Sequence, residues 1–422
     1  MIEVAERQDL HVAGEPAWLA ALRRKAMDRF GTLGFPTTKQ EDWRFTNVSA
    51  IARAEFEAGR PAQVDLTAWP LAGLDCSARL VFVNGHLCED LTAVNGLPEG
   101  VRVRRGPPEA HFARYAAFDQ QPFVALNTAH FADAALVEIA EGVTLEKPVH
   151  LVFISAPNGQ PTVSHPRTLI LAGRSSQAAV VETYLGPEGV AYFTNAVTEI
   201  VAAEQSVLDH YRLQFEGRQA FHVATVEAVQ RRSSVFNSHN VAFGAALARN
   251  DINSVLGAEG AECFLNGLYV TSGNQHVDNH TMLDHAQPNS ASRELYKGIL
   301  SGHGTGVFNG KIVVRKDAQK TNAIQSNKNL LLSGDAVINT KPQLEIYADD
   351  VRCTHGATVG QLDGEALFYM QSRGVPAGQA RELLTYAFAA ELLERMRWQP
   401  IREKLTRELS AALSANRDGG AE

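Results

Sequence analysis

The chain has 422 residues, a length that allows one large domain or two to three smaller ones, and its composition, 45% hydrophobic and 20% charged, is ordinary for a soluble globular protein. Its formal net charge of −8 argues against a general nucleic-acid-binding protein, because such proteins carry a basic surface. Its four cysteines are too few for a disulfide scaffold, so we expect reduced thiols.

The start of the chain, MIEVAERQDLHVAGEP, lacks the basic segment followed by an apolar segment that makes a secretory signal peptide. No apolar run in the sequence approaches the ~20 residues that a membrane-spanning helix needs. We therefore expect a cytoplasmic protein without membrane association.

The region 1–75 is expected to be mainly helical. After Pro16, a residue suited to a first helical turn, apolar residues recur every four positions and predict an amphipathic helix: Trp18, Leu22, Ala26 and Phe30. Gly31 would end this helix. The segment 34–48 follows, where Pro and paired Thr residues before an acidic run predict a loop leading into a short helix start.

The region 76–135 is mixed. Its first part, 79–86, reads RLVFVNGH and is expected to be a strand that ends in an Asn-Gly turn. The rest combines Gly and Pro corners with a helix expected around residues 109–118.

From about residue 135 onward, strand-like runs follow one another without a helical period. Asn and Gly recur at positions that we interpret as corners between short strands: Asn195, Asn237, Asn240, Asn253, Asn266, Gly267, Asn309 and Gly310. Many short, even strands favour a parallel β-solenoid, in which each coil covers the apolar face of the next. A β-sandwich, with hairpin turns at 8–12-residue spacing, stays open as the alternative on this pattern alone.

The end of this region is predicted to contain strands of four or five residues, cut by Gly, Asn, Asp and Lys-Pro: Lys311–Arg315, Asn329–Leu332, Ala336–Asn339, Gln343–Tyr347 and Val351–His355. Side chains alternate along a strand, so Cys353 and His355 share one face, with Cα atoms about 6.5–7 Å apart. A thiolate and an imidazole at this separation suit one soft or borderline metal ion. Two ligands are too few for a closed structural site, so the others would come from elsewhere, such as another chain.

Residues 364–422 are expected to form a small helical domain. A helix at 365–373 ends at Gly374, a second opens at Pro376, and Pro400 separates it from a third. The last two carry apolar stripes at a spacing of four: Leu384, Phe388 and Leu392 (backed by Leu383 and Ala387), then Ile401, Leu405, Leu409 and Leu413.

Other groups of polar residues are better explained by structural roles than by metal or phosphate binding. The run QHVDNHTMLDH at 275–285 offers imidazoles and carboxylates for a divalent ion, but its spacing matches no standard motif, and hydrogen-bonded polar residues at solenoid corners explain it more simply. The glycine-rich segment 301–306 around His303 completes no phosphate-binding motif and is interpreted as a tight turn. Nucleotide hydrolysis by this chain is therefore not expected.

The sequence contains neither a G-x-S-x-G elbow nor a C-x-x-C pair. Three carboxylates that could serve acid–base chemistry are better explained by a surface strand and its turn: Glu345, Asp349 and Asp350. Three cysteines are expected to be core or half-buried small apolar residues: Cys76, Cys88 and Cys263. On the residues alone, even Cys353 and His355 are better explained as a buried Cys beside a polar strand residue.

One segment changes that weighting. Residues 343–375, QLEIYADDVRCTHGATVGQLDGEALFYMQSRGV, closely resemble the core of the SufB/SufD family of iron–sulfur cluster assembly proteins. The resemblance is strongest over 277–374 and is weaker at 34–48, 79–86 and 122–131. Within the family, Cys353-Thr354-His355-Gly356-Ala357 resembles the SufD branch, because SufB has a Glu directly after the His.

The resemblance implies a right-handed parallel β-helix over 136–363, preceded by the regions 1–75 and 76–135 and followed by the helical domain 364–422. It implies a non-enzymatic component of a SufBCD-type complex. This component would pair with a SufB-type scaffold through the β-helix, hold a SufC-type ATPase through 364–422, and help to acquire iron for new clusters.

The same resemblance implies that Cys353 and His355 belong to a transient iron or nascent cluster site shared with SufB. No permanently bound cofactor is expected, and a homodimer of the isolated chain is left open. Two other classes of function also stay open. One is a carbohydrate-active enzyme, since parallel β-helices host polysaccharide lyases, although those usually carry a secretion signal. The other is a purely structural subunit without a metal role.

Overall fold

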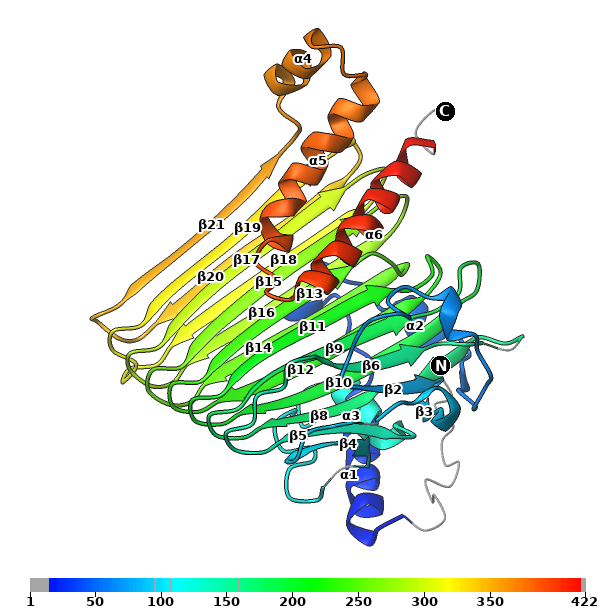
Figure 1. Cartoon of the computed structure of the whole chain (residues 1–422), viewed down its shortest axis with the longest axis vertical. Coiled ribbons are helices and arrows are strands. Elements are labelled where there is room, and N and C mark those ends of the chain that lie inside the picture. Colours follow the sequence, from blue (N-terminus) through cyan, green and yellow to red (C-terminus); the bar gives the residue numbers. More distant parts are fainter. Residues whose placement is uncertain (1–14, 95, 107, 158, 419–422) are drawn as a thin grey trace.

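The computed structural model describes residues 15–94, 96–106, 108–157 and 159–418. Two parallel β-sheets face each other, and the chain alternates between them coil by coil, with helices at both ends of the sequence (Figure 1). Register partners on successive coils lie about 30 residues apart in sequence, as Ala291 and Asn322 do. The predicted mainly β parallel solenoid is confirmed. The boundaries suggested for its four regions stay predictions.

The strands of sheet A, in chain order, are β4 (Val101–Arg105), β5 (Ala134–Ile139), β8 (Arg167–Ala172), β10 (Tyr192–Ala202), β12 (Phe221–Gln230), β14 (Leu247–Leu256), β16 (His276–His285), β18 (Thr305–Val314) and β20 (Val337–Ile346). β4 runs antiparallel to β5, and the others run parallel. The short strands β1 (Glu57–Ala58) and β7 (Thr162–Ser164) join this sheet beside β10.

The strands of sheet B, in chain order, are β2 (Ala78–Val83), β3 (His86–Leu87), β6 (Val149–Ile154), β9 (Gln177–Leu185), β11 (Val207–Phe215), β13 (Val235–Ala242), β15 (Glu262–Thr271), β17 (Ala291–Leu300), β19 (Asn322–Leu331) and β21 (Arg352–Gly360). β2 and β3 form an antiparallel hairpin, whose turn residues Asn84 and Gly85 both have positive φ. The predicted Asn-Gly turn is confirmed.

The main apolar core lies between the two sheets, where every second side chain of each strand points inward. Leu283 and Ile312, register partners on β16 and β18, are both fully buried there. The middle of this interior is polar, however. Glu182 and His210 form a buried hydrogen bond at 3.3 Å, and Arg212 donates to Asn250 at 2.6 Å. Such groups are tolerated in a core because they are paired.

Helices cover the outer faces of both sheets. The outer face of sheet A packs against α1 (Ala17–Leu33), α2 (Ser49–Arg53) and α3 (Pro122–His130). On the outer face of sheet B, α5 (Ala377–Leu393) and α6 (Gln399–Asp418) lie side by side, while α4 (Gly364–Ser372) stands beyond the last coil (Figure 1). Three short 3₁₀ helices complete the described part of the chain: Glu41–Trp43, Leu66–Ala68 and Glu89–Leu91. No helix in that part combines the length and apolarity that a bilayer crossing needs.

The N-terminal helix is confirmed, but its predicted end is wrong. It continues through Gly31 to Leu33 and ends at Gly34, whose φ is 63°. The short helix start predicted within 34–48 is confirmed by the 3₁₀ turn at Glu41–Trp43. Gly34 ends the helix because glycine adopts a positive φ without steric cost, and its N–H donates to the carbonyl oxygen of Phe30.

The helix predicted around 109–118 is wrong, because a buried carboxylate organises this segment as turns. Glu199 accepts hydrogen bonds from the backbone N–H groups of Ala113, Tyr115 and Ala116 at 2.8–3.0 Å. Its charge is balanced by Arg167 at 2.6 Å. The next helix, α3, went unpredicted because nearly all its side chains are buried, which leaves no amphipathic period.

The prediction of four- or five-residue strands with Asn and Gly at corners is also wrong. Strands β14 to β20 each have ten residues, and the Asn and Gly positions lie inside these strands or inside β10 and β13. Inward asparagines bond to one another across the interior, as Asn240 and Asn250 both do with Oδ1 of Asn279. Pro342 can lie within β20 because its backbone N, which has no hydrogen to donate, faces the open edge of the sheet. The N–H groups of Val337 and Tyr347 donate toward β18, so the backbone N atoms at even positions of β20 face the other way.

The two apolar stripes of the C-terminal helices fare differently. Every predicted residue of the α6 stripe is buried, which confirms it. On α5 the stripe is displaced: Leu392 is buried, but Leu384 and Phe388 are half-buried and Leu383 is 45% exposed. The polar residue Thr385 and the small residue Ala389 occupy the centre of the buried face, so apolarity alone did not mark it.

We expect Leu392→Ala to lower the free energy of unfolding by about 2–5 kcal/mol, because it leaves a cavity between α5 and sheet B. Leu383→Ala, on the same helix but exposed, should change it by less than about 0.5 kcal/mol. Urea unfolding followed by circular dichroism measures both. Equal effects of the two substitutions would contradict the observed docking face.

Candidate functional site

The last coil of the solenoid is its least covered part. Among the described strands, β20 and β21 each have a sheet neighbour on one side only, so a row of backbone donors and acceptors on the other side is free. Residues of β20 are mostly half-buried and residues of β21 mostly exposed, whereas most residues of β18 and half of those of β19 are buried. This end of the molecule is thus an open edge.

Apolar side chains accompany this open edge. Four residues are half-buried against the inner core: Ile338, Leu344, Val351 and Cys353. Others are more exposed and lie on or beside β20 and β21: Val337, Ile346, Tyr347 and Val359. Exposed apolar residues next to free backbone groups are typical of a surface that receives another chain.

The structure places Cys353 and His355 on β21, at this edge. Their register partners on β19, Ala323 and Gln325, are both buried in the interior, so both residues stand on the inward face of their strand. The predicted shared face of Val351, Cys353 and His355 agrees with this register. Cys353 is half-buried and His355 is exposed, because no further coil in the described chain covers them.

Burial raises the pKa of the Cys353 thiol above its ordinary value, an effect that the backbone N–H of Ala323 opposes. This thiol is therefore protonated at neutral pH, and a metal ion that bound it would have to displace the proton. No group of three or more His, Cys, Asp or Glu side chains in the described residues is arranged to hold a metal. Cys353 and His355 are two donors of a set that this chain does not complete, and their role as ligands stays a prediction.

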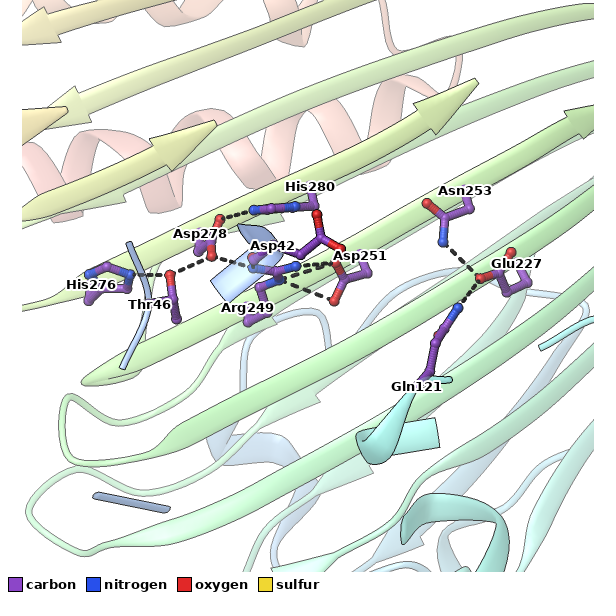
Figure 2. A network of polar contacts seen from close by, with 10 residues as sticks. All are labelled: Asp42, Thr46, Gln121, Glu227, Arg249, Asp251, Asn253, His276, Asp278 and His280. Carbon is purple, nitrogen blue, oxygen red and sulfur yellow. Dashed lines mark hydrogen bonds and ion pairs between the residues drawn. The ribbon is translucent and has the colours of Figure 1, made fainter. Parts of the chain in front are cut away.

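Except for Gln275, the run 275–285 is strand β16 and not a set of corners, so the expected position of its other polar residues is wrong. Asp278 and His280 point outward, toward the N-terminal segment, and their side chains are 3.2 Å apart (Figure 2). Arg249 on β14 bonds Asp278 at 2.6 Å and Asp251 at 2.7 Å. It also donates to the backbone carbonyl of Asp42 at 2.7 Å.

This network fastens the N-terminal segment to sheet A. Thr46 bonds His276 at 2.9 Å, and the guanidinium of Arg249 lies 4.3 Å from the ring centre of Trp43. Burial works against the ionisation of Asp278, but the guanidinium of Arg249 and the hydrogen bond with His280 outweigh it and hold the pKa of that carboxyl well below its usual range. With a guanidinium at its centre, the cluster is an anchor and not a metal site.

A second carboxylate in the same region was not singled out by the sequence. Glu227 on β12 accepts hydrogen bonds from Asn253 at 2.7 Å and Gln121 at 3.2 Å (Figure 2). Burial raises its pKa to about 7, although both amides lower it. Nothing in its sequence neighbourhood marks it, because its hydrogen-bond partners come from the residue before α3 and from the next coil.

The remaining predicted groups have the plain roles expected of them. His303 lies in a turn next to Gly302, whose φ is 61°. Glu345 pairs with Lys311 on the sheet surface at 2.7 Å, while Asp349 and Asp350 lie in the following bend. The other three cysteines are free, one buried and two half-buried: Cys263, then Cys76 and Cys88.

A second exposed surface lies on α4. Phe368 and Tyr369 are 73% and 60% exposed, and no residue of this helix is buried. The helix is nevertheless well formed, with Asp363 capping its first turn by accepting from the N–H groups of Glu365 and Ala366. Two large aromatic side chains on a rigid, uncovered helix are typical of a contact site for another protein.

Two models of known protein families match the chain. Residues 153–388 match the family model described as "SUF system FeS cluster assembly, SufBD core domain", and residues 4–151 match the "SufBD protein N-terminal region". The chain belongs to the SufBD family. The resemblance deduced from residues 343–375 is thereby confirmed, together with a role in iron–sulfur cluster assembly.

Relatives of this SufBD protein match it over nearly their full lengths. Escherichia coli SufD, an iron–sulfur cluster assembly protein, is 33% identical, over 92% of this chain and 90% of its own. A SufBD family protein of Synechocystis is 32% identical, over 94% of this chain and 91% of its own. Bacillus subtilis SufD is 25% identical, with 93% coverage of both chains. These matches bear out the resemblance to the SufD branch.

We expect Glu227 to make stability depend on pH. Its carboxyl has a pKa of about 7 in the folded state and an ordinary value of about 4.3 when unfolded, so the folded state binds more protons between these values. Stability contributed by the protonated form is therefore complete below about pH 4.3 and is lost as pH rises through 7. Between pH 5 and 8 the loss should be about 2–3 kcal/mol.

Glu227→Gln keeps an acceptor for Asn253 and Gln121 but does not titrate. The free energy of unfolding of this variant should therefore not show the loss of about 2–3 kcal/mol between pH 5 and 8. Urea unfolding of both proteins at several pH values measures the difference. A wild-type profile parallel to that of the variant would show that Glu227 has an ordinary pKa.

Proposed function

We propose that this chain is the SufD-type component of a SufBCD-type complex, in which it pairs with a SufB-type scaffold and holds a SufC-type ATPase. In this role it is not itself an enzyme and contributes to iron acquisition and to the assembly of new clusters at the SufB–SufD interface. The observation that carries the proposal is the open last coil, with Cys353 and His355 on its inward face. The following features support each part.

Pairing with a scaffold is supported by the form of the open edge. An edge strand that is neither short nor covered invites another strand, and main-chain hydrogen bonds then supply affinity. β21 has nine residues. The backbone N–H of Arg352 donates toward β19, and N–H groups alternate in direction along a strand, so those of the odd positions, including Cys353 and His355, face the open edge. A SufB-type solenoid with a matching last coil would cover the half-buried apolar residues and continue both sheets.

A shared iron site is supported by the donor set. Thiolate and imidazole suit iron and iron–sulfur clusters, which are here the cargo of the assembly reaction. Two donors from one chain leave positions for ligands from the partner, and the inward face on which they stand becomes enclosed only when a partner covers the coil. The proposal thus explains why the site is incomplete in a single chain.

Attachment of the ATPase is supported by the C-terminal helices. α5 and α6 are fixed on sheet B by an apolar interface and by Lys297, which donates to the carbonyl oxygen of Phe388 at 2.6 Å and pairs with Glu391. α4 projects from this fixed base with Phe368 and Tyr369 exposed. A rigid base with an uncovered aromatic helix is suited to hold a second protein.

The proposed compartment is the cytoplasm, where thiols stay reduced. All four cysteines are free, which agrees with a reducing environment. A purely structural subunit, which would stabilise its partners without touching iron, stays the competing hypothesis. The two differ in what Cys353 and His355 do.

We expect Cys353→Ala and His355→Ala each to abolish most of the iron and sulfide that co-purifies with the complex of the three proteins, because each removes one of the two donors that this chain supplies. The composition of the complex should be unchanged, since neither side chain is needed to pair the strands. Iron and sulfide assays on the purified complex, grown in cells that express all three components, measure this. Full cluster content in both variants with the complex intact would favour the purely structural subunit.

We expect Phe368→Asp to abolish co-purification of the SufC-type ATPase while the SufB-type partner is retained. A charge at the centre of an aromatic contact costs more than about 2 kcal/mol of binding, which is at least a 30-fold loss of affinity. Phe45→Asp, at another exposed aromatic residue on the N-terminal segment, is the control and should leave ATPase binding intact. Retention of the ATPase by the Phe368 variant would count against α4 as its docking site.

A further inference from the structure

A line of polar side chains leads from the open end into the interior at the position of His355. In the strand register, His355 on β21 lies beside Gln325 on β19, which lies beside Glu294 on β17. Register partners on neighbouring parallel strands are about 4.8 Å apart and point to the same face. Gln325 and Glu294 are only 1% and 2% exposed. We call these three residues the inward file.

The inner end of the inward file is fixed by hydrogen bonds. Thr281 Oγ1 donates to Glu294 Oε1 at 2.6 Å, and Gln325 Nε2 donates to Glu294 Oε2 at 2.8 Å. Because both carboxyl oxygens are engaged, the Glu294 side chain has one orientation. Glu294 in turn orients the amide of Gln325, whose NH₂ group points to Glu294 while its carbonyl oxygen points elsewhere.

That carbonyl oxygen is left over. Gln325 Oε1 is buried and accepts no hydrogen bond from any residue that the structure describes. The amide lies where Gly310 leaves room for it, since a Cβ at position 310 would come within 2.3 Å of Gln325 Nε2. A buried acceptor without a donor is costly, and a native protein that keeps one usually has a use for it. The next side chain outward in the file is His355.

The neighbouring file provides a contrast. Cys353 has Ala323 as its register partner on β19, and Ser292 lies beyond on β17. Neither carries an amide, and Ala323 offers no side-chain acceptor at all. The unpaired acceptor, Gln325 Oε1, therefore lies beside His355, in the inward file, and not in the neighbouring file that contains Cys353. An imidazole has an N–H to give, whereas a metal-bound thiolate has none.

We propose that Gln325 positions His355 for metal binding: its Oε1 accepts the N–H of one ring nitrogen, which leaves the other nitrogen for the metal. This inference rests on the proposed function, in which His355 contributes to a shared iron site. Histidines that bind metals commonly donate their other N–H to an oxygen, which fixes the tautomer and the ring orientation. Glu294 and Thr281 act one step further in, by holding the amide of Gln325.

The test uses Fe²⁺ under anaerobic conditions as the probe, with the chain in its complex with the SufB-type and SufC-type partners. Gln325→Met keeps the length and volume of the side chain but removes the acceptor. Gly310→Ala keeps the amide but displaces it. We expect each to weaken Fe²⁺ binding by about 10- to 100-fold, as His355→Ala also should. Gln343→Leu, at a half-buried glutamine on the outward face of β20, is the matched control and should bind Fe²⁺ as the wild type does.

Exchanging the side chains of Glu294 and Gln325 distinguishes a positioning role of Gln325 from a packing role. In the double variant Glu294→Gln with Gln325→Glu, the amide at 294 donates to the carboxylate at 325, and that carboxylate still offers an oxygen to the imidazole. We expect Fe²⁺ affinity within about twofold of the wild type, because the acceptor is restored. A purely structural role of Gln325 would not predict this recovery, since a carboxylate in its place packs no better than methionine.

The outcomes are distinct. Wild-type Fe²⁺ binding by His355→Ala would overturn the metal role of His355 and the positioning role of Gln325 together. Loss of binding in His355→Ala with full binding in Gln325→Met would overturn only the positioning role and leave the proposed function standing. Equal losses in Gln325→Met and in the exchange variant would also overturn it. Should Gly310→Ala fail to assemble with its partners, the other two variants decide, each checked by co-purification and by its unfolding temperature.

Discussion

The backbone ladder between successive coils is the constraint on which the rest of this structure depends. In a parallel solenoid every strand receives its hydrogen bonds from the coil before and the coil after, and every inward side chain is covered in the same way. This requirement fixes ten-residue strands from β14 to β20 in unbroken register. It also leaves the last coil, β20 and β21, half satisfied. The candidate site lies where the repeating structure stops, because inward side chains of β21 are exposed there.

The buried polar residues show how such a stack keeps its register. A core made only of aliphatic side chains would allow neighbouring coils to slip, since one apolar contact replaces another at little cost. Arg212 reaches Asn250 on the facing sheet, and Asn279 accepts from Asn240 and Asn250. A shift by one residue would break these bonds and leave the groups unpaired in the interior, which is expensive. We infer that polar pairs in the middle of the solenoid hold the coils in place for the more open end.

The sequence predicted the solenoid, the flanking helices and the strand that carries Cys353 and His355, because each leaves a local pattern of apolar residues or a recognisable segment. It failed where distant residues decide the conformation. The segment around Ala113 forms turns because Glu199, far along the chain, binds its N–H groups. The approach of Gln325 to His355 is likewise invisible in the sequence, since 30 positions separate the two and only the strand register joins them. Asparagine and glycine inside strands were misread because in most proteins they mark turns.

The two ends of the solenoid are unlike each other, and this difference limits how many molecules can associate. At the early end, sheet B finishes in the two-residue strand β3 and sheet A in β4, and both run against the direction of the coils. A solenoid with two matching ends could stack head to tail into a filament without limit. Here a partner that meets the open edge finds no second edge of the same kind behind it. Association through the open edge would therefore end at two solenoids, whereas matching ends would permit polymerisation.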